Sequence, residues 1–573
     1  MRKLDYLISE ARRAAVTIRN FHGTIRVVSH YDADGISAAS IIAAALSREG
    51  KPFRLSIIRQ LSEAKVTQLA EEKNLLTIFA DLGSGHLKSI QEQLIFPGAK
   101  AVILDHHQVK GDVLQGNAES MIHVNPLVFG INENLSGAGV AYFLAKELDP
   151  ENIELGYLGI VGAVGDSQMG SIEERWSLSG PNKEILKDAK KSGKLSVGHG
   201  LRIWGRHSRP LHKALEFCTD PCIPGVSGSE SASVQFLTEL GIPLKRKKST
   251  ESTSIEGGDG DVWRTLSDLT EEEQKILATG IIKERIRGNQ RNPHAIFGDV
   301  YEMPHHPAEF MSVEEFATML NACGKLGKPY AGMSMCMANP RSFDEARSLM
   351  LGYRKDIGKA ISWLNGNSDA IRTTDRGTYM LAGDRISEDI ISNVASIFNK
   401  SGFVPGDRPV FAFADAEEGM VKVSARAHDL LVENGLDVQR LVSEAALRFG
   451  GEGGGHKGAA GATIPKGSLQ SFISCIEDML SSFRKASESN INNINTNVPE
   501  EQTLGIRGEN YGTAESERRQ TGEDGGKASR DAFKPRDEGR EEAGSPASAE
   551  RGKKPEKMEG QGLVRYFGSK DVQ

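Results

Sequence analysis

The sequence predicts an α/β protein with two α/β domains, a mainly helical segment between them and a disordered C-terminal tail. Short apolar strands alternate with helix-length segments in the first 185 residues and again after about residue 370. This alternation is typical of βαβ units that build a buried parallel sheet. The chain has 573 residues, too many for one ordinary core. Only 38% are apolar, which indicates that part of the chain does not fold.

The first α/β domain contains three predicted strands, and each ends in a turn that carries a carboxylate. The strands are 25–29, 76–80 and 101–104; the helix 36–46 follows the first turn, and an apolar run at 158–164 precedes a fourth turn. Ligands of open α/β sheets bind beyond the carboxyl ends of the strands, so these four turns should converge. Together they carry Asp32, Asp34, Asp81, Asp105, His106, His107 and Asp166.

Each of these residues alone would more often cap a helix or fix a turn. Five aspartates and two histidines at one sheet edge are different, because the carboxylates would repel one another unless cations were bound between them. Mixed Asp and His ligation suits Mn²⁺, with Mg²⁺ or Zn²⁺ as alternatives. Two such ions about 3.5–4 Å apart can activate water and stabilise the oxygens of a phosphoryl transfer. The sequence therefore predicts a two-metal site.

The composition limits how the protein can bind a phosphate-bearing substrate. The formal net charge of −7 excludes a simple polycationic nucleic-acid binder, so the positive charge would come from the metals. The N-terminus lacks the apolar core of a signal peptide. The longest small-apolar run, 36–46, is shorter than the roughly 20 residues that cross a bilayer. We therefore expect a cytoplasmic protein without a membrane partner.

The later segments differ from the first domain in pattern. The boundaries that we expect are 1–190 for the first domain, 191–365 for the helical connector, 366–485 for the second α/β domain and 486–573 for the disordered tail. In the second domain we expect a strand at 377–381, a helix at 386–398, a hairpin of strands 409–414 and 420–424, and a glycine-rich run at 450–461. The tail has too few large apolar side chains to offset the entropy of ordering.

Polar residues of the connector have two readings. Arg202, Arg206 and Arg209, with His207 and His212, would either line the path of a nucleic-acid strand or belong to a solvated connector. The basic clusters 245–248 and 283–291 would either contact a nucleic-acid backbone or remain charged surface segments. Cys218 and Cys222 lack a second ligand pair at zinc-like spacing, so we do not expect a metal clip there.

Six motifs resemble those of the DHH phosphoesterase superfamily. Four are in the first domain: Ser29–Gly35, Ala80–Gly83, Leu104–His107 and Gly162–Ser167. Two are in the second domain, which resembles the DHH-associated domain: Lys422–Arg426 and Gly453–Gly461. The segment from Trp204 to Glu230 is similar to archaeal RecJ-type exonucleases, a group that includes the GINS-associated nuclease.

The resemblance implies a role for each matching residue. The implied metal ligands are Asp32, Asp34, Asp81, His106 and Asp166, with Asp81 bridging two Mn²⁺ or Mg²⁺ ions. The implied catalytic residues are Asp105, which would orient its histidine neighbours, and His107, which would face the scissile phosphate. The implied substrate-binding residues are Arg426, His456 and a nest of N–H groups at Gly453, Gly454 and Gly455. His30 is not among the expected ligands, because relatives with a histidine ligand in the first motif place it further ahead.

The function that the resemblance implies is metal-dependent hydrolysis of single-stranded DNA or RNA to mononucleotides by an exonuclease of replication or repair. The alternatives are a phosphodiesterase of short oligoribonucleotides or cyclic dinucleotides, and a replisome scaffold with little catalysis. The expected partners are a single-stranded nucleic acid and a GINS or replicative helicase complex.

A second partner is suggested by the C-terminus. Leu563, Tyr566 and Phe567 have the spacing of a sliding-clamp-binding peptide, although Gly560 stands where such peptides have glutamine. A random apolar terminus is the alternative. Because an apolar anchor on a long disordered tether is otherwise a liability, we expect this segment to bind a sliding clamp.

Overall fold

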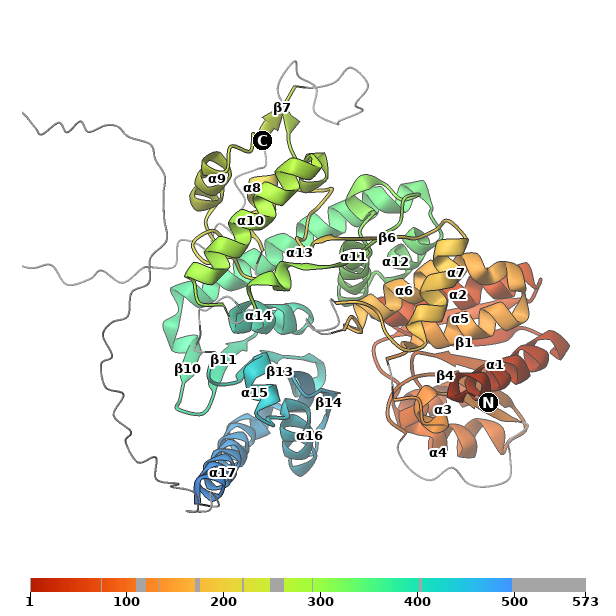
Figure 1. Cartoon of the computed structure of the whole chain (residues 1–573). Coiled ribbons are helices and arrows are strands. Elements are labelled where there is room, and N and C mark those ends of the chain that lie inside the picture. The colour runs from red at the N-terminus through yellow and green to blue at the C-terminus, as the bar shows by residue number, and fades with distance from the viewer. Residues whose placement is uncertain are drawn as a thin grey trace, which may run out of the picture. The chain divides into compact units, whose positions relative to one another are not determined.

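The computed structural model describes residues 2–496, except for 74, 110–119, 133, 171–175, 219–220, 248–261, 291, 401–403 and 405. Figure 1 shows the described helices and strands. The expected clamp-binding segment and nearly all of the expected disordered tail lie outside these residues. Of the described helices, none is long and apolar enough to cross a membrane.

The first sheet has five parallel strands in the order β2-β1-β3-β4-β5. They are β1 (Ile25–His30), β2 (Phe53–Ile58), β3 (Leu76–Ala80), β4 (Lys100–Leu104) and β5 (Met121–Val124). The three predicted strands are confirmed, and β2 and β5 are additional. From β1 the chain goes to β2 on one side and then returns to β3 on the other. This reversal places the turns after β1 and β3 side by side at the carboxyl edge of the sheet, where α/β folds bind ligands.

Helices cover both faces of this sheet, which is why its strands are apolar at consecutive positions. Val27 and Ile78 pack in the core that includes α1 (Lys3–Asn20), α2 (Ala33–Arg48) and α5 (Gly137–Leu148). Val28 and Phe79 point to the opposite face and pack with α3 (Glu63–Glu71) and α4 (Leu87–Ile90). The fourth predicted turn follows α6 (Gly156–Gly165), which packs against α2 and α5.

The connector contains helices and two small antiparallel sheets. Helix α7 (Asn182–Lys191), which precedes it, packs against α6 in the first domain. The elements of the connector are β6 (Ser196–Leu201), α8 (Leu211–Glu216), α9 (Glu230–Glu239), β7 (Lys245–Arg246), β8 (Val262–Trp263), α10 (Glu271–Arg287), β9 (Phe297–Glu302), α11 (Val313–Lys325), α12 (Pro329–Cys336) and α13 (Pro340–Gly366). Strand β6 pairs with β9, and β7 with β8. Helices α8 to α10 enclose a hydrophobic core of their own, whereas α11 to α13 contribute to the core of the first domain.

The second α/β domain is built on a six-stranded mixed sheet in the order β10-β11-β12-β13-β15-β14. Its elements are β10 (Ile371–Thr373), β11 (Thr378–Gly383), α14 (Glu388–Lys400), β12 (Val410–Asp415), β13 (Met420–Arg426), α15 (Asp429–Glu433), α16 (Val438–Arg448), β14 (Glu452–His456), β15 (Ala459–Pro465) and α17 (Leu469–Thr496). The predicted β12–β13 hairpin is confirmed. On one face Ala412 packs with α14, and on the other the ring of Phe413 lies 6.2 Å from that of Phe472 in α17.

Two expectations for this domain were wrong. The glycine-rich run, in which we expected a nest of N–H groups, forms the β14–β15 hairpin, because Gly453–Gly455 pair in register with Ala460–Ala462. Helix α17 continues to Thr496, whereas we expected disorder from residue 486. No glycine or proline occurs between 469 and 496 to end the helix earlier.

Candidate metal centre

The carboxyl edge of the first sheet brings all the expected ligands together. Three groups of side chains have donor atoms within 4.8 Å of one another: Asp34, His106 and Asp166; His30, Asp32 and Asp81; and Asp81, His106 and His107. Helix α2 supplies two of these residues, since Asp32 is its N-cap, accepting from Gly35 N at 2.9 Å, and Asp34 lies in its first turn. The turns thus converge as predicted from the strand ends.

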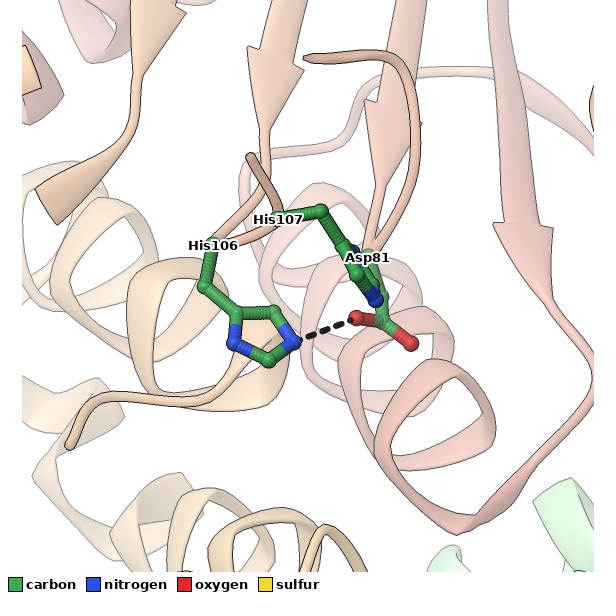
Figure 2. Close-up of side chains that lie close together, drawn as sticks. All are labelled: Asp81, His106 and His107. Carbon is green, nitrogen blue, oxygen red and sulfur yellow. Dashed lines mark ion pairs between the residues drawn. The ribbon is translucent and has the colours of Figure 1, made fainter. Parts of the chain in front are cut away.

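Asp81 connects the groups. It lies between β3 and α4 with φ of 58°, in the left-handed region that aspartate tolerates. Figure 2 shows the ring of His106 directed at its carboxylate, and His106 Nε2 is 3.4 Å from Asp81 Oδ1. His30 Nδ1 lies 3.4 Å from Asp81 Oδ2. Both oxygens are buried, and neither accepts a hydrogen bond from a described residue. Such an orphaned carboxylate fits a bound cation.

Asp34 is fixed by the beginning of α5. It is buried, and its two oxygens accept hydrogen bonds from Gly137 N at 2.7 Å and Ala138 N at 2.9 Å. These amides have no partner within a helix, and they favour a negative charge. A Cβ on Gly137 would lie 2.5 Å from Asp81 Oδ1, and a Cβ on Gly162 would lie 2.3 Å from Asp34 Oδ1. Both glycines are therefore required by the close approach of the carboxylates.

The charges of the site are not balanced by the protein. Burial, with Asp81 adding repulsion, holds the pKa of Asp34 well above its usual range. Burial also raises the pKa of Asp166. Against the effect of burial, His106 and His30 hold the pKa of Asp81 below its usual range. Burial would lower the pKa of His106, but Asp81 and Asp166 raise it to about 10. Oxygen and imidazole donors with excess negative charge fit Mn²⁺ or Mg²⁺.

Asp105 holds the ring of His107. Its buried carboxylate accepts from His107 Nδ1 at 2.7 Å, from His106 N at 2.8 Å and from Ser84 N at 2.8 Å. It therefore orients the imidazole of His107 but contacts His106 only through the backbone. Against the effect of burial, Asp105 raises the pKa of His107. The side chain of His107 is 55% exposed, so its other nitrogen is accessible to a substrate.

Asn125 is a supporting residue that the sequence analysis missed. Its Nδ2 donates to Ser84 Oγ at 2.8 Å and to the carbonyl of His107 at 2.9 Å. It fixes the turn after β4 from the end of the neighbouring strand β5. The signal would have been a polar residue after a predicted strand, but β5 has only four residues and one of them is His123.

The expected substrate-binding residues lie on β13 and β14. Arg426 is largely enclosed: its Nε donates to Ser396 Oγ at 2.8 Å, Nη1 donates to the Ala425 carbonyl at 2.7 Å, and burial lowers its pKa to about 10. Gly453, Gly454 and Gly455 pair with β15 as part of β14, the edge strand of the sheet, and Gly455 has a φ of 134°. The expected nest of N–H groups is therefore wrong, because a nest requires helical conformations of alternating hand. His456 ends β14 and is exposed.

Lys325 at the end of α11 also reaches this region, and no sequence motif indicated it. Its Nζ donates to Asn393 Oδ1 at 2.5 Å and Ser392 Oγ at 3.3 Å. Burial, with repulsion from Arg426, lowers its pKa to about 8. The preceding Gly324 is packed so tightly that a Cβ there would lie 1.8 Å from the carbonyl oxygen of Tyr31. The end of α11 is thus fixed against the turn that carries Asp32.

The polar residues of the connector bind other groups of the protein. Arg206 Nε and His207 Nε2 lie 3.3 and 2.7 Å from Glu302 Oε1. The guanidinium of Arg209 stacks 4.1 Å from the ring centre of Trp204. Cys218 Sγ donates to the carbonyl of Pro221 at 3.3 Å, and neither Cys218 nor Cys222 belongs to a potential metal-binding group among the described residues. These contacts give the residues roles in packing.

Comparison with known proteins gives three family matches along the chain. The N-terminal domain of the DHH family matches residues 24–161, the DHH-CID domain matches 203–295, and the DHHA1 domain matches 376–482. An uncharacterized protein of Methanocaldococcus jannaschii is 28% identical over 487 residues, which are 84% of this chain and 98% of that protein.

Solved structures with a similar fold include two proteins. Cdc45 from Entamoeba histolytica has a TM-score of 0.56 at 9% identity and covers 83% of this chain and 99% of its own. Thermus thermophilus RecJ in complex with Mn²⁺ has a TM-score of 0.49 at 17% identity and covers 82% of this chain. The match spans 55% of the RecJ chain. Along the chain, an N-terminal domain of the DHH family is thus followed by a DHH-CID domain and a DHHA1 domain.

Proposed function

We propose that this protein is a metal-dependent exonuclease that hydrolyses single-stranded DNA or RNA to mononucleotides in DNA replication or repair. The observation that carries the proposal is the set of donor groups that share Asp81, whose buried oxygens lack hydrogen bonds from the described residues. We assign Asp32, Asp34, Asp81, His106 and Asp166 as ligands of two divalent cations, Mn²⁺ or Mg²⁺. Bound there, the cations would supply the charge that activates water and stabilises the attacking and leaving oxygens.

The protein itself orients the reacting groups. The amides of Gly137 and Ala138 fix Asp34 before any substrate arrives, so its position costs no rearrangement during the reaction. Asp105 fixes Nδ1 of His107 and leaves Nε2 to donate a hydrogen bond or a proton to the phosphate. The glycines at 137 and 162 keep the space between the carboxylates free of side chains.

The second domain would hold the substrate. Lys325 and Arg426 hydrogen bond only to neutral oxygens in the contacts described above, so their charges are available to a phosphate group. The glycines of β14 lack side chains and allow a nucleic-acid backbone to approach the edge of the sheet. His456 at the end of this strand would hydrogen bond the terminal phosphate or a base.

The proposed partners are a replicative complex and a sliding clamp. The DHH-CID match and the fold shared with Cdc45 support association with a GINS or replicative helicase complex. Leu563, Tyr566 and Phe567 support binding to a sliding clamp. Deletion of residues 560–573 should abolish clamp binding without changing hydrolysis of short oligonucleotides, and unchanged clamp binding would refute that part.

The experiment that tests the proposed activity uses the full chain with Mn²⁺ on single-stranded DNA and RNA labelled at either end. Wild-type protein should release mononucleotides from one end, whereas Asp34→Ala and His106→Ala should be inactive with unchanged circular dichroism. Lys328→Ala, a change of an exposed residue, is the matched control. Turnover by either well-folded ligand variant would refute the site.

Two alternatives are separated by the same assay. Hydrolysis limited to substrates of a few nucleotides would identify a phosphodiesterase of short oligoribonucleotides or cyclic dinucleotides. Absence of hydrolysis together with absence of bound metal would identify a replisome scaffold, which the Cdc45-like fold favours and the complete donor set opposes.

A further inference from the structure

We propose that Gln168 is a positioning residue of the metal centre: its side-chain amide holds Asp166, and Asn182 at the start of α7 holds that amide in the required orientation. The inference deepens the proposed function and rests on it, because Asp166 is one of the ligands assigned there. Gln168 directly follows the motif Gly162–Ser167 and is not part of it, so the sequence analysis did not indicate this role.

The carboxylate of Asp166 depends on a single hydrogen bond. Gln168 Nε2 donates to Asp166 Oδ2 at 2.8 Å, and no other described residue donates to this carboxylate. Asp34 differs, because two backbone amides at the start of α5 hold both of its oxygens. The side chain of Asp166 is 20% exposed and lies just beyond the end of α6. Without Gln168, other rotamers of this side chain are therefore open to it.

The orientation of the Gln168 amide follows from its second partner. Asn182 Nδ2 donates to the backbone carbonyl of Asn134 at 3.1 Å and to Gln168 Oε1 at 3.0 Å. A backbone carbonyl can only accept, so it fixes which end of the Asn182 amide faces this way. With Oε1 occupied as an acceptor, Nε2 of Gln168 is directed at Asp166. The order of donors and acceptors is thus set by a backbone group and does not depend on the titration of any side chain.

The burial of the two amides opposes the competing reading, in which Gln168 only fills space between α6 and α7. Gln168 is 6% exposed and Asn182 is 0% exposed. Burying an amide costs free energy unless it is hydrogen-bonded, whereas an apolar side chain of similar size would fill the same space without this cost. The amide is therefore explained by what it holds.

The backbone of Gln168 is fixed on both sides. Gln168 N donates to the carbonyl of Ala163 in the last turn of α6 at 2.9 Å. The next residue, Met169, pairs with Leu178 in an antiparallel bridge. Leu178 N in turn donates to the hydroxyl of Tyr301, a buried residue of β9, at 3.0 Å. The connector thus anchors the turn from which Gln168 reaches Asp166.

Metal binding by the full chain tests the proposal without reference to activity. Equilibrium dialysis and calorimetry should give two Mn²⁺ per wild-type chain. In Gln168→Met, which keeps the size of the side chain and removes the amide, one Mn²⁺ should bind about 10- to 100-fold more weakly, because loss of a residue that supports a metal ligand typically costs this much. Turnover at limiting Mn²⁺ should fall by a similar factor and recover as Mn²⁺ is raised.

Gln274→Met is the matched control. Gln274 in α10 also uses its Nε2 for a hydrogen bond, which it donates to the carbonyl of Leu269 at 3.0 Å, so the same group and the same kind of contact are lost. This variant should bind two Mn²⁺ as tightly as the wild type. Two equally tight Mn²⁺ in Gln168→Met, whatever its stability to denaturant, would overturn the proposal.

Asn182→Asp tests whether Asn182 acts through Gln168. The substitution replaces the donor that faces Gln168 by an acceptor, so the Gln168 amide should turn and direct Oε1 at Asp166. One Mn²⁺ should again bind about 10- to 100-fold more weakly, although an added negative charge by itself would attract the cation. In the Gln168→Met background, Asn182→Asp should cause no further loss of Mn²⁺ affinity.

The outcomes separate this proposal from the proposed function. Unchanged or stronger Mn²⁺ binding in Asn182→Asp, or an additive loss in the double variant, would overturn the role of the two amides. Failure of the wild type to bind any divalent cation would instead overturn the proposed function.

Discussion

Replacing Gly137 by alanine should damage the metal centre without damaging the fold. The new Cβ would lie 2.5 Å from Asp81 Oδ1 and 2.8 Å from Asp81 Cα, whereas ordinary contacts begin at 3.4 Å. Asp81 must therefore move by about 0.9 Å, the difference between 3.4 and 2.5 Å. A misplacement of about 1 Å at reacting groups costs about 100-fold in rate. We expect this loss in kcat, together with weaker Mn²⁺ binding.

Gly139→Ala is the matched control on the same helix. Its Cβ would also meet an atom at 2.5 Å, but this is the end of the Leu135 side chain and not a carboxylate. Both variants gain about 1 kcal/mol from helix propensity and lose about 1–3 kcal/mol to overpacking. Their melting temperatures should therefore be similar.

The assay compares thermal unfolding, Mn²⁺ affinity and nuclease turnover of the two glycine variants. Only Gly137→Ala should lose metal affinity and turnover. Equal activity of the two variants, at equal stability, would show that the space beside Asp81 is not needed and would refute the reasoning.

Three further predictions concern other residues. Lys325→Met should raise KM for a single-stranded oligonucleotide about tenfold and leave kcat unchanged, and it should reduce the salt dependence of binding by about one released ion. Lys328→Met should match wild type. A fall in kcat without a change in KM would contradict this prediction. Asp105→Asn should lower kcat about 10- to 100-fold with both metals retained. Turnover equal to that of the wild type would show that Asp105 is not needed to orient His107. His306 is buried against Phe316 and Phe343, and burial lowers its pKa to about 3, so the folded state disfavours the proton that the unfolded state accepts below pH 6.5. The free energy of unfolding, measured by denaturant titration, should therefore fall by about 2 kcal/mol between pH 7 and pH 5. His306→Phe should remove this loss. The same dependence of the unfolding free energy on pH in the wild type and the variant would contradict the prediction.

The convergence of the site was predictable because the carboxylates follow strand ends. Parallel strands end at one edge, so Asp32, Asp81 and Asp105 could be placed together from the strand pattern alone. Strand β2 was missed because five of its six positions are only partly buried and the sixth is exposed, and β5 because it has four residues.

Contacts that depend on tertiary packing could not be predicted. Lys325 is about 290 residues from Asp32 in sequence, and nothing in its local pattern distinguishes it from a surface lysine at a helix end. Likewise, the spacing of His30 to Asp32 gave no indication that its Nδ1 lies between two carboxylates. Glycines 453–455 were expected to form a nest of N–H groups, but pairing with β15 decides their conformation.

The glycines of β14 have a consequence for solubility. An open sheet edge usually invites a strand of another molecule, which is a route to aggregation. Such pairing gains much of its stability from side chains that pack across the two strands, and glycine has none to offer. Glycine also loses the most conformational freedom when an added strand fixes it. The edge formed by Gly453–Gly455 can therefore stay accessible while offering little to a foreign strand.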